Sequence, residues 1–228
     1  MRKKGVCIIS GGMDSALSGK MAEVEGYDII ALHFNYGQRT EKRELEAFRK
    51  IAKYLNSIEI YEIDLDFFKS IGASALIDRS LDIPTKGLSE GIPITYVPFR
   101  NGIFLSIATS IAEKHGAEAI YIGVVEEDSS GYPDCRDSYI RAMERAIELG
   151  TKDDTKIEIK MPLVHMKKGE IVKRALELGV PLEDTWSCYQ SEDEACGVCD
   201  SCRLRLKGFE LAGVSDLIKY NSTKNFSE

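Results

Sequence analysis

The chain has 228 residues, of which 43% are hydrophobic and 29% are charged, and its formal net charge is −7. These values are typical of a globular protein with one well-buried core. The acidic balance disfavours broad binding to nucleic acid, because contacts with phosphate need Lys and Arg. The apolar runs are too short to cross a membrane, and no signal peptide is visible. We therefore expect a cytoplasmic protein without a nucleic-acid or membrane partner.

Apolar runs alternate with helix-compatible segments along most of the chain. They predict strands at 6–9, 29–34, 58–63, 119–125 and 157–159. Helices are predicted at 16–25, 40–55, 101–115, 138–149, 167–178 and 199–211. Residues 64–91 have no clear period, and we expect a long, partly mobile insertion there. The alternation favours an α/β fold with a doubly wound parallel sheet. We expect this sheet domain at 1–180, with a small C-terminal region at 181–228 packed on it.

The first predicted strand leads into the sequence Ser10-Gly-Gly-Met-Asp-Ser15. Two adjacent glycines allow a sharp turn and a close approach of the backbone to a ligand. The helix that follows offers N–H groups and the positive end of its dipole to a phosphate, and Asp14 can hold Mg²⁺ through oxygen. The segment lacks the Walker and dinucleotide-binding patterns. It resembles the pyrophosphate loop of the N-type ATP pyrophosphatases, which cleave ATP to AMP and pyrophosphate.

Polar loops follow the predicted strands at the sheet edge where ligands bind in such folds. They are 33–39 after the second strand, 126–136 after the fourth, and 96–101 before a helix that should face the same crevice. Together they predict one site. His33 there is either a hydrogen-bonded structural residue or a ligand. Cys135 stands beside Arg136, whose charge can lower its pKa, and is either a catalytic thiol or a packed or substrate-lining residue.

Four cysteines lie close together near the end of the chain. Cys188, Cys196, Cys199 and Cys202 have the spacing C-x7-C-x2-C-x2-C. Such a set suits tetrahedral zinc, and it also suits an iron–sulfur cluster or, less well, disulfides. Zinc is favoured because ATP-activating chemistry needs no electron transfer. A site with four protein ligands is closed, so we expect a structural role in pinning the C-terminal helix onto the sheet domain.

Six motifs occur in order across nearly the whole chain. They occupy 10–15 (SGGMDS), 33–39 (HFNYGQR), 97–101 (VPFRN), 130–136 (SGYPDCR), 186–188 (WSC) and 196–203 (CGVCDSCR). Together they resemble the 7-cyano-7-deazaguanine synthase (QueC) family of queuosine biosynthesis. The family's loop usually continues with Thr after Ser15, where this chain has Ala16. That difference puts one contact at the helix start in doubt and leaves the fold expectation unchanged.

The resemblance implies a fold like that of the adenine nucleotide alpha hydrolases and a ligase activity. It implies that 7-carboxy-7-deazaguanine and ammonia are converted to the nitrile 7-cyano-7-deazaguanine (preQ0) at the expense of ATP. The carboxylate is adenylated, ammonia gives an amide, and a second adenylation dehydrates the amide. Bound Zn²⁺ and a homodimer are also implied.

Candidate residues for each role follow from these motifs. Arg100 and Arg136 can hold the substrate carboxylate or phosphates through a bidentate fork, Asp134 can accept a guanine-like N–H pair, and Tyr132 or Phe99 can stack on the ring. The catalytic candidates are Asp14, Ser15, Arg100 and Arg136. The ATP candidates are Ile9, Ser10, Gly11, Gly12, Met13, Asp14, Ser15, Ala16, Leu17, Ser18, Gly19 and His33. The substrate candidates are Tyr36, Gln38, Arg39, Phe99, Arg100, Asn101, Tyr132, Asp134 and Cys135.

Other functions remain open at this point. A tRNA-modifying thiolase or a lysidine synthase uses the same kind of loop. A thiolase, however, needs paired catalytic cysteines and a basic surface for tRNA, whereas this chain has only Cys135 as a candidate and is acidic overall. A zinc-knuckle binding module needs a basic patch around the cysteines, where Arg203, Arg205 and Lys207 are offset by acidic residues. A relative that attaches the deazaguanine to a protein is compatible with the sequence.

Overall fold

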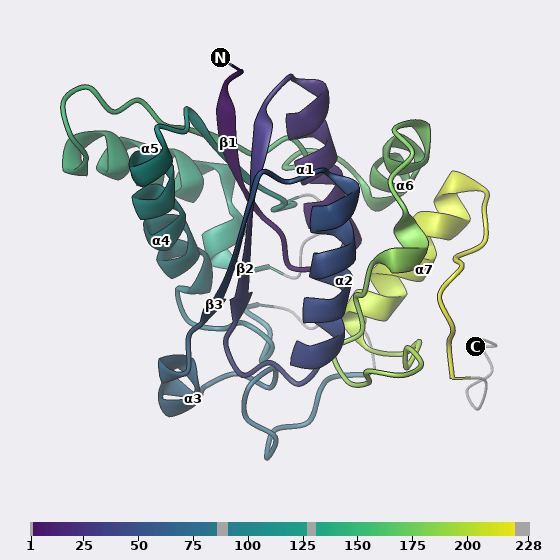
Figure 1. The fold of residues 1–228 in the computed structure, drawn as a ribbon. Helices are drawn as coiled ribbons and strands as arrows, with labels where there is room; N and C mark the ends of the chain where they lie inside the picture. Colours follow the sequence, from purple (N-terminus) through teal and green to yellow (C-terminus); the bar gives the residue numbers. More distant parts are fainter. Residues whose placement is uncertain (1, 86–90, 127–130, 222–228) are drawn as a thin grey trace.

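The computed structural model describes residues 2–85, 91–126 and 131–221 (Figure 1). Its strands form a parallel sheet in the order β3-β2-β1-β4-β5. The strand bounds are Lys4–Ile8 (β1), Asp28–Asn35 (β2), Glu59–Asp64 (β3), Ala119–Ile122 (β4) and Glu158–Lys160 (β5). The predicted parallel sheet is confirmed.

Helices connect the strands and cover both faces of the sheet. Their bounds are Met13–Val24 (α1), Glu41–Tyr54 (α2), Phe67–Ile71 (α3), Arg100–His115 (α4), Asp137–Gly150 (α5), Lys168–Glu177 (α6) and Asp200–Ala212 (α7), with short 3₁₀ turns at Pro133–Cys135 (η1) and Leu182–Asp184 (η2). Figure 1 shows α4 and α5 on one side of the sheet and α1 and α2 on the other. Within the described ranges, no helix has the length and apolarity to span a bilayer.

The central strand β1 explains why both faces need a cover. Val6 and Ile8 belong to a core cluster with Phe104 of α4, and Cys7 belongs to a second cluster with Leu17 of α1. Successive side chains of a strand point to opposite faces, so a strand with apolar residues at every position is buried from both sides. The continuous apolar run of this strand is therefore what selects the three-layer arrangement.

Two element boundaries differ from the sequence expectation and bear on the site. Helix α1 begins at Met13 rather than at residue 16, so Asp14 and Ser15 belong to its first turn. Strand β4 ends at Ile122 rather than at 125, because its ladder with β1 stops at the pair Ile8↔Ile122. The chain beyond β4 then leaves the sheet, and Glu126 N donates to Val164 O at 2.9 Å.

The expectation of a partly mobile insertion is corrected for residues 64–85, which are folded and packed on the core. This stretch contains α3, and it buries Phe68, Ala75 and Leu76 in the core. Arg39 anchors it, because its guanidinium donates to the carbonyls of Ala75 at 2.7 Å and Asp78 at 2.9 Å. The stretch shows no period because it packs through scattered apolar side chains and not through one face. Residues 86–90 of the expected insertion lie outside the described ranges.

The C-terminal part of the chain packs on the sheet domain through a close crossing of two helices. A Cβ on Gly169 of α6 would lie 2.7 Å from Leu211 Cβ of α7, so glycine is what lets the two helices approach. Figure 1 shows α6 and α7 side by side next to α1 and α2. The loop between η2 and α7 consequently lies against the glycine loop, with Trp186 N donating to Gly11 O at 2.8 Å.

Candidate active site

The glycine loop forms a tight turn against α2. Ser15 Oγ lies 3.1 Å from Ser10 N and donates to Gly12 O at 2.9 Å, which closes the loop on itself. Gly11 has φ +91°, and a Cβ there would lie 2.5 Å from Glu44 O. Only glycine fits this conformation and this contact. Among the described residues, no side chain caps the first turn of α1, and an uncapped helix start is a ready site for phosphate.

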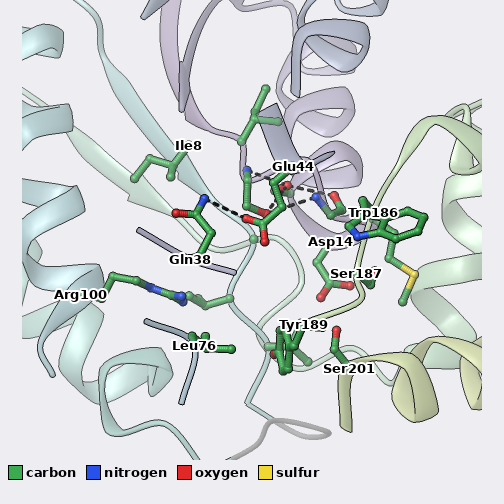
Figure 2. Close-up of a pocket in the computed structure, with 18 of the residues that line it drawn as sticks. Ile8, Asp14, Gln38, Glu44, Leu76, Arg100, Trp186, Ser187, Tyr189 and Ser201 are labelled. Atoms are coloured by element: carbon green, nitrogen blue, oxygen red, sulfur yellow. Dashed lines mark hydrogen bonds between the residues drawn. The ribbon is translucent and has the colours of Figure 1, made fainter. Parts of the chain in front are cut away.

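A cavity of about 260 Å³ opens beside this loop, at the carboxyl ends of β1, β2 and β4 (Figure 2). The cavity therefore lies at the edge of the sheet where ligands bind in such folds, which is where the sequence analysis predicts a site. The cavity brings together these residues proposed from the sequence: Ile9, Ser10, Gly12, Met13, Asp14, Ser15, Tyr36, Gln38, Arg39, Arg100, Asn101, Tyr132 and Cys135.

Other residues proposed for ATP lie away from the cavity lining. Ala16, Leu17, Ser18 and Gly19 are buried inside α1. His33 is fully buried, its Nδ1 lies 2.9 Å from Ile9 O, and its ring stacks on Phe48. Burial lowers the pKa of His33. This environment is that of a hydrogen-bonded structural histidine.

Two of the proposed substrate residues, Asp134 and Phe99, and the proposed catalytic residue Arg136 also lie outside the lining. Asp134 Oδ2 accepts from Asn101 N at 3.0 Å, so it stabilises the first turn of α4. Phe99 is half exposed, has φ +55°, and packs edge-on against Tyr139. Arg136 is exposed. Ser130, the first residue of the motif at 130–136, lies outside the described part of the chain.

Cys135 lines the cavity as a protonated thiol. Burial raises its pKa to about 12, and the nearby Asp134 charge acts in the same direction. Asn101 Nδ2 lies 3.3 Å from its Sγ. A reactive cysteine needs the thiolate, so this environment favours a packed or substrate-lining residue over a catalytic thiol.

Arg100 enters the cavity from the start of α4. Its Nη1 donates to the hydroxyl of Tyr36 at 3.0 Å, and its guanidinium lies 5.6 Å from the centre of the Phe104 ring. Figure 2 shows it pointing into the same space as Asp14. A guanidinium held by neutral partners remains available to a carboxylate or phosphate.

Three charged residues of the lining, Lys168, Glu44 and Arg205, were not proposed as site residues from the sequence. Lys168, at the first position of α6, has its Nζ 2.5 Å from Asp14 Oδ2 across 154 positions of sequence. Glu44 of α2 lies between Gln38 and the glycine loop. Lys168 follows the fifth predicted strand, so the strand-end rule was a signal that could have found it. Glu44 sits inside a predicted helix, where nothing in the pattern marks it.

The four cysteines come together at the N-terminal end of α7. Their Sγ atoms all lie within 4.8 Å of one another. A tetrahedral zinc site with Zn–S bonds of about 2.3 Å has S···S edges of about 3.8 Å, and Cys196 Sγ lies 3.9 Å from Cys202 Sγ. Backbone N–H groups donate to Cys188 Sγ and Cys196 Sγ. The donor set and its spacing therefore fit one tetrahedral metal ion, and none of the four forms a disulfide.

The cysteine cluster also shapes the cavity. The segment around it contributes Trp186, Ser187, Tyr189 and Ser201 to the lining. Figure 2 shows Ser187, Tyr189 and Ser201 around Asp14. Trp186 is buried, and its Nε1 donates to Ser191 O at 3.1 Å.

Solved structures share this fold. A 4-thiouridine synthetase in complex with RNA and bound ATP has a TM-score of 0.56 and 22% identity, and the match covers 92% of this chain and 50% of that chain. An NMN synthetase from Francisella tularensis has a TM-score of 0.50 and 18% identity, over 94% of this chain and 79% of that one. At these identities the likeness concerns the fold alone.

Sequence relatives are much more similar. A 7-cyano-7-deazaguanine synthase of a Sulfurovum species is 75% identical over 220 residues, which cover 96% of this chain and 99% of that protein. One of a Nitratiruptor species is 67% identical over 220 residues, 96% of this chain and 100% of that protein. The family model described as queuosine biosynthesis protein QueC matches residues 4–213. The loop, the cavity and these matches lead to one conclusion: the chain belongs to the QueC family.

Proposed function

We propose that this protein converts 7-carboxy-7-deazaguanine and ammonia to 7-cyano-7-deazaguanine, forming AMP and pyrophosphate from two molecules of ATP. The observation that carries the proposal is the uncapped start of α1 at the glycine loop, which opens into one cavity with Asp14 and Arg100. Membership of the QueC family supports the choice of substrate.

The chemistry requires two activations at one carbon. A carboxylate is a poor electrophile, and adenylation supplies a leaving group. Ammonia then gives the amide, and adenylation of the amide oxygen allows the nitrile to form. Because phosphoryl transfer relies on positioning and charge neutralisation, the loop amides and Ser15 would hold the pyrophosphate end of ATP. Arg100 would hold the substrate carboxylate or the α-phosphate.

Asp14 and Lys168 suit the phosphate end of this site. Asp14 Oδ1 is buried and has no hydrogen-bond partner in the part of the chain that the structure describes. A carboxylate oxygen in that state fits a divalent cation, so we propose that Asp14 holds Mg²⁺. When bound, Mg²⁺ neutralises phosphate charge. The ammonium of Lys168 lies next to the same carboxylate and would face the phosphates too.

The cysteine cluster would bind zinc in a structural role. We favour zinc over an iron–sulfur cluster because no step of the proposed reaction transfers an electron. Four cysteine ligands leave no position for substrate. The division into a sheet domain at 1–180 and a zinc-binding region at 181–228, the homodimer, the cytoplasmic location and the absence of a nucleic-acid partner stay predictions.

One incubation tests the proposed function. Wild-type protein is mixed with 7-carboxy-7-deazaguanine, ammonium and ATP with Mg²⁺, and the products are identified by mass spectrometry. We expect the amide and then the nitrile as free small molecules, with AMP and pyrophosphate. Formation of ADP, or transfer of the deazaguanine to a protein, would contradict the proposal.

The variant Asp14→Asn sharpens this test. The substitution keeps the shape and removes the charge, so it should fold normally and keep its metal. It should lose the carboxylate-to-amide and amide-to-nitrile steps together, because both draw on the same AMP-forming site. Glu23→Gln, near the other end of the same helix and outside the cavity lining, is the matched control and should keep both steps. Loss of only one step in Asp14→Asn would overturn a single ATP site.

A further inference from the structure

A carboxyl group with no assigned role lines the cavity beside the glycine loop. It belongs to Glu44 of α2, the residue whose backbone carbonyl packs against Gly11. Figure 2 shows the carboxylate of Glu44 in the same space as Asp14, Gln38 and Arg100. Glu44 thus faces the region in which the proposed site would hold the reacting carbon.

Neutral donors hold this carboxylate in one orientation. Thr40 Oγ1 donates to Glu44 Oε1 at 2.7 Å, and Gln38 Nε2 donates to Oε2 at 3.2 Å. Gln38 is fixed in turn, because its Oε1 accepts from Tyr36 N at 2.8 Å. Thr40 and Gln38 are 1% and 4% exposed. Among the residues that the structure describes, each carboxylate oxygen therefore has one donor and keeps lone-pair capacity.

The surroundings adjust the basicity of Glu44. Burial raises its pKa to about 7, and the hydrogen bonds from Thr40 and Gln38 and the charge of Arg100 act against that rise. Glu41 on the same helix raises the pKa of Glu44 further, and the charge of Glu44 in turn raises the pKa of Tyr36, which follows β2. A group whose pKa lies near the working pH can both accept a proton and release it.

The proposed reaction removes all three protons from the ammonia nitrogen, and two of them leave in the steps that form new C–N bonds. In the first step the lone pair of ammonia forms the C–N bond, the bond from the acyl carbon to the AMP oxygen breaks, and one of three nitrogen protons must leave to give the neutral amide. Adenylation of the amide oxygen releases one more nitrogen proton and gives a neutral imidate. In the second step this imidate loses its last nitrogen proton. That N–H electron pair becomes the third C–N bond while the C–O bond to AMP breaks.

We propose that Glu44 is the base that accepts the nitrogen proton in both steps, an inference that rests on the proposed function. In each step one carboxylate becomes one carboxylic acid, and AMP leaves with its bonding electron pair. The proton passes to solvent before the next step. Adenylation of the carboxylate needs no such base, because the substrate carboxylate is already the nucleophile toward the α-phosphate.

This difference between adenylation and amination gives the experiment. In Glu44→Gln the amide oxygen can still accept from Gln38 Nε2, and the amide N–H can donate to Thr40 Oγ1, whose own proton has a second acceptor in Cys188 O at 3.2 Å. The geometry is therefore kept and the base is lost. Carboxylate-dependent exchange of labelled pyrophosphate into ATP should stay near the wild-type rate, with an unchanged KM for the carboxylate. Amide formation from ammonium, and nitrile formation from added amide, should each fall by about 100-fold or more.

Two controls make the result specific. Glu46→Gln lies on the same helix with its side chain exposed and should behave as wild type in every assay. Hydroxylamine, which is largely unprotonated at neutral pH and forms a more acidic adduct, should lose much less of its rate in Glu44→Gln than ammonia does.

The inference is overturned if Glu44→Gln makes amide at the wild-type rate. It is also overturned if exchange is lost or the KM for the carboxylate rises in step with amide formation, because Glu44 would then bind the heterocycle or ATP instead. A wild-type protein that exchanges pyrophosphate but forms no amide would overturn the proposed function, and the inference with it.

Discussion

The glycine loop (residues 9–15) and the cysteine region (residues 185–221) line the same cavity, but different forces hold them. The loop follows β1, which pairs with β2 on one side and with β4 on the other. Backbone hydrogen bonds of the sheet thus fix where the loop begins, and Ser15 closes it. Functional side chains on such a scaffold can change without loss of the fold.

The cysteine region lacks this support. No strand or helix lies between residues 185 and 199, a stretch that the structure describes in full. This region is held by the cluster of four cysteine sulfurs and by a buried ion pair, and not by the hydrogen bonds of a sheet. In the ion pair, Arg205 Nε lies 2.6 Å from Asp216 Oδ2, and both side chains are at most 2% exposed. The difference teaches that changes in the loop should cost chemistry, whereas changes in the cysteine region should cost structure.

Loss of a cysteine ligand should have the largest effect. Cys199→Ser removes one of the four proposed ligands, and structural zinc contributes about 10–16 kcal/mol in zinc-finger peptides. That is as large as the whole stability of a typical domain, about 5–15 kcal/mol. We expect insoluble protein or a metal-free, protease-sensitive cysteine region, measured by metal analysis and limited proteolysis. Cys7→Ala, a buried thiol outside the cluster, should keep its metal. A metal-free wild type with normal melting of Cys199→Ser would refute the structural zinc.

Loss of the buried arginine should have the next largest effect. Arg205→Ala leaves Asp216 buried without its counter-charge, which costs about 3–5 kcal/mol. It also removes the hydrogen bonds to Thr185 Oγ1 at 2.8 Å and Leu182 O at 2.9 Å. Urea unfolding should show the loss. Lys207→Ala, exposed on the same helix, should stay within about 0.5 kcal/mol of wild type. Equal stability of the two variants would mean that Arg205 does not support the region.

The smallest expected effect lies near the loop and depends on pH. The pKa of Glu44 is raised from 4.5 to about 7 by burial. The folded protein therefore binds this proton more tightly than the unfolded chain, and the contribution to the free energy of unfolding falls as pH rises from about 4.5 to about 7. Glu44→Gln lacks this loss, so it should gain stability relative to wild type between about pH 5 and about pH 8. If the difference in free energy of unfolding between Glu44→Gln and wild type, measured with urea, is the same at about pH 5 and at about pH 8, the raised pKa is contradicted.

The sequence was sufficient for the order of the strands, for the helices other than α3, and for the glycine loop. The apolar run of β1 and the period of the helices predict helices on both faces of the sheet, because the central strand is apolar at successive positions and must be buried from both sides. Asp14 and Arg100, which line the cavity, were proposed from the strand-end rule and the motifs. Lys168 and Glu44 were missed, since their position in the cavity depends on how α6 and α2 pack and not on local pattern.

Other assignments show the limit of reading loops by residue type. Asp134 has the chemistry for a guanine-like N–H pair, yet its carboxylate accepts from the backbone of Asn101. The residue type and position of His33 likewise suggest a ligand, yet its ring is directed into the core and not toward the cavity. Both lie in the predicted loops, and only tertiary structure decides which way a side chain points.

The chain after α7 has a consequence for where the protein can be shortened. Tyr220 Oη donates to Asp216 Oδ2 at 2.7 Å, and Lys219 O accepts from Ala195 N at 2.8 Å. This segment therefore returns across the cysteine region and supplies the counter-charge of Arg205. A chain cut after Gly213, where the match to the family model ends, would keep the whole of that match. It would nevertheless leave a buried guanidinium without its carboxylate, so the smallest stable unit should extend beyond the residues that the family model matches.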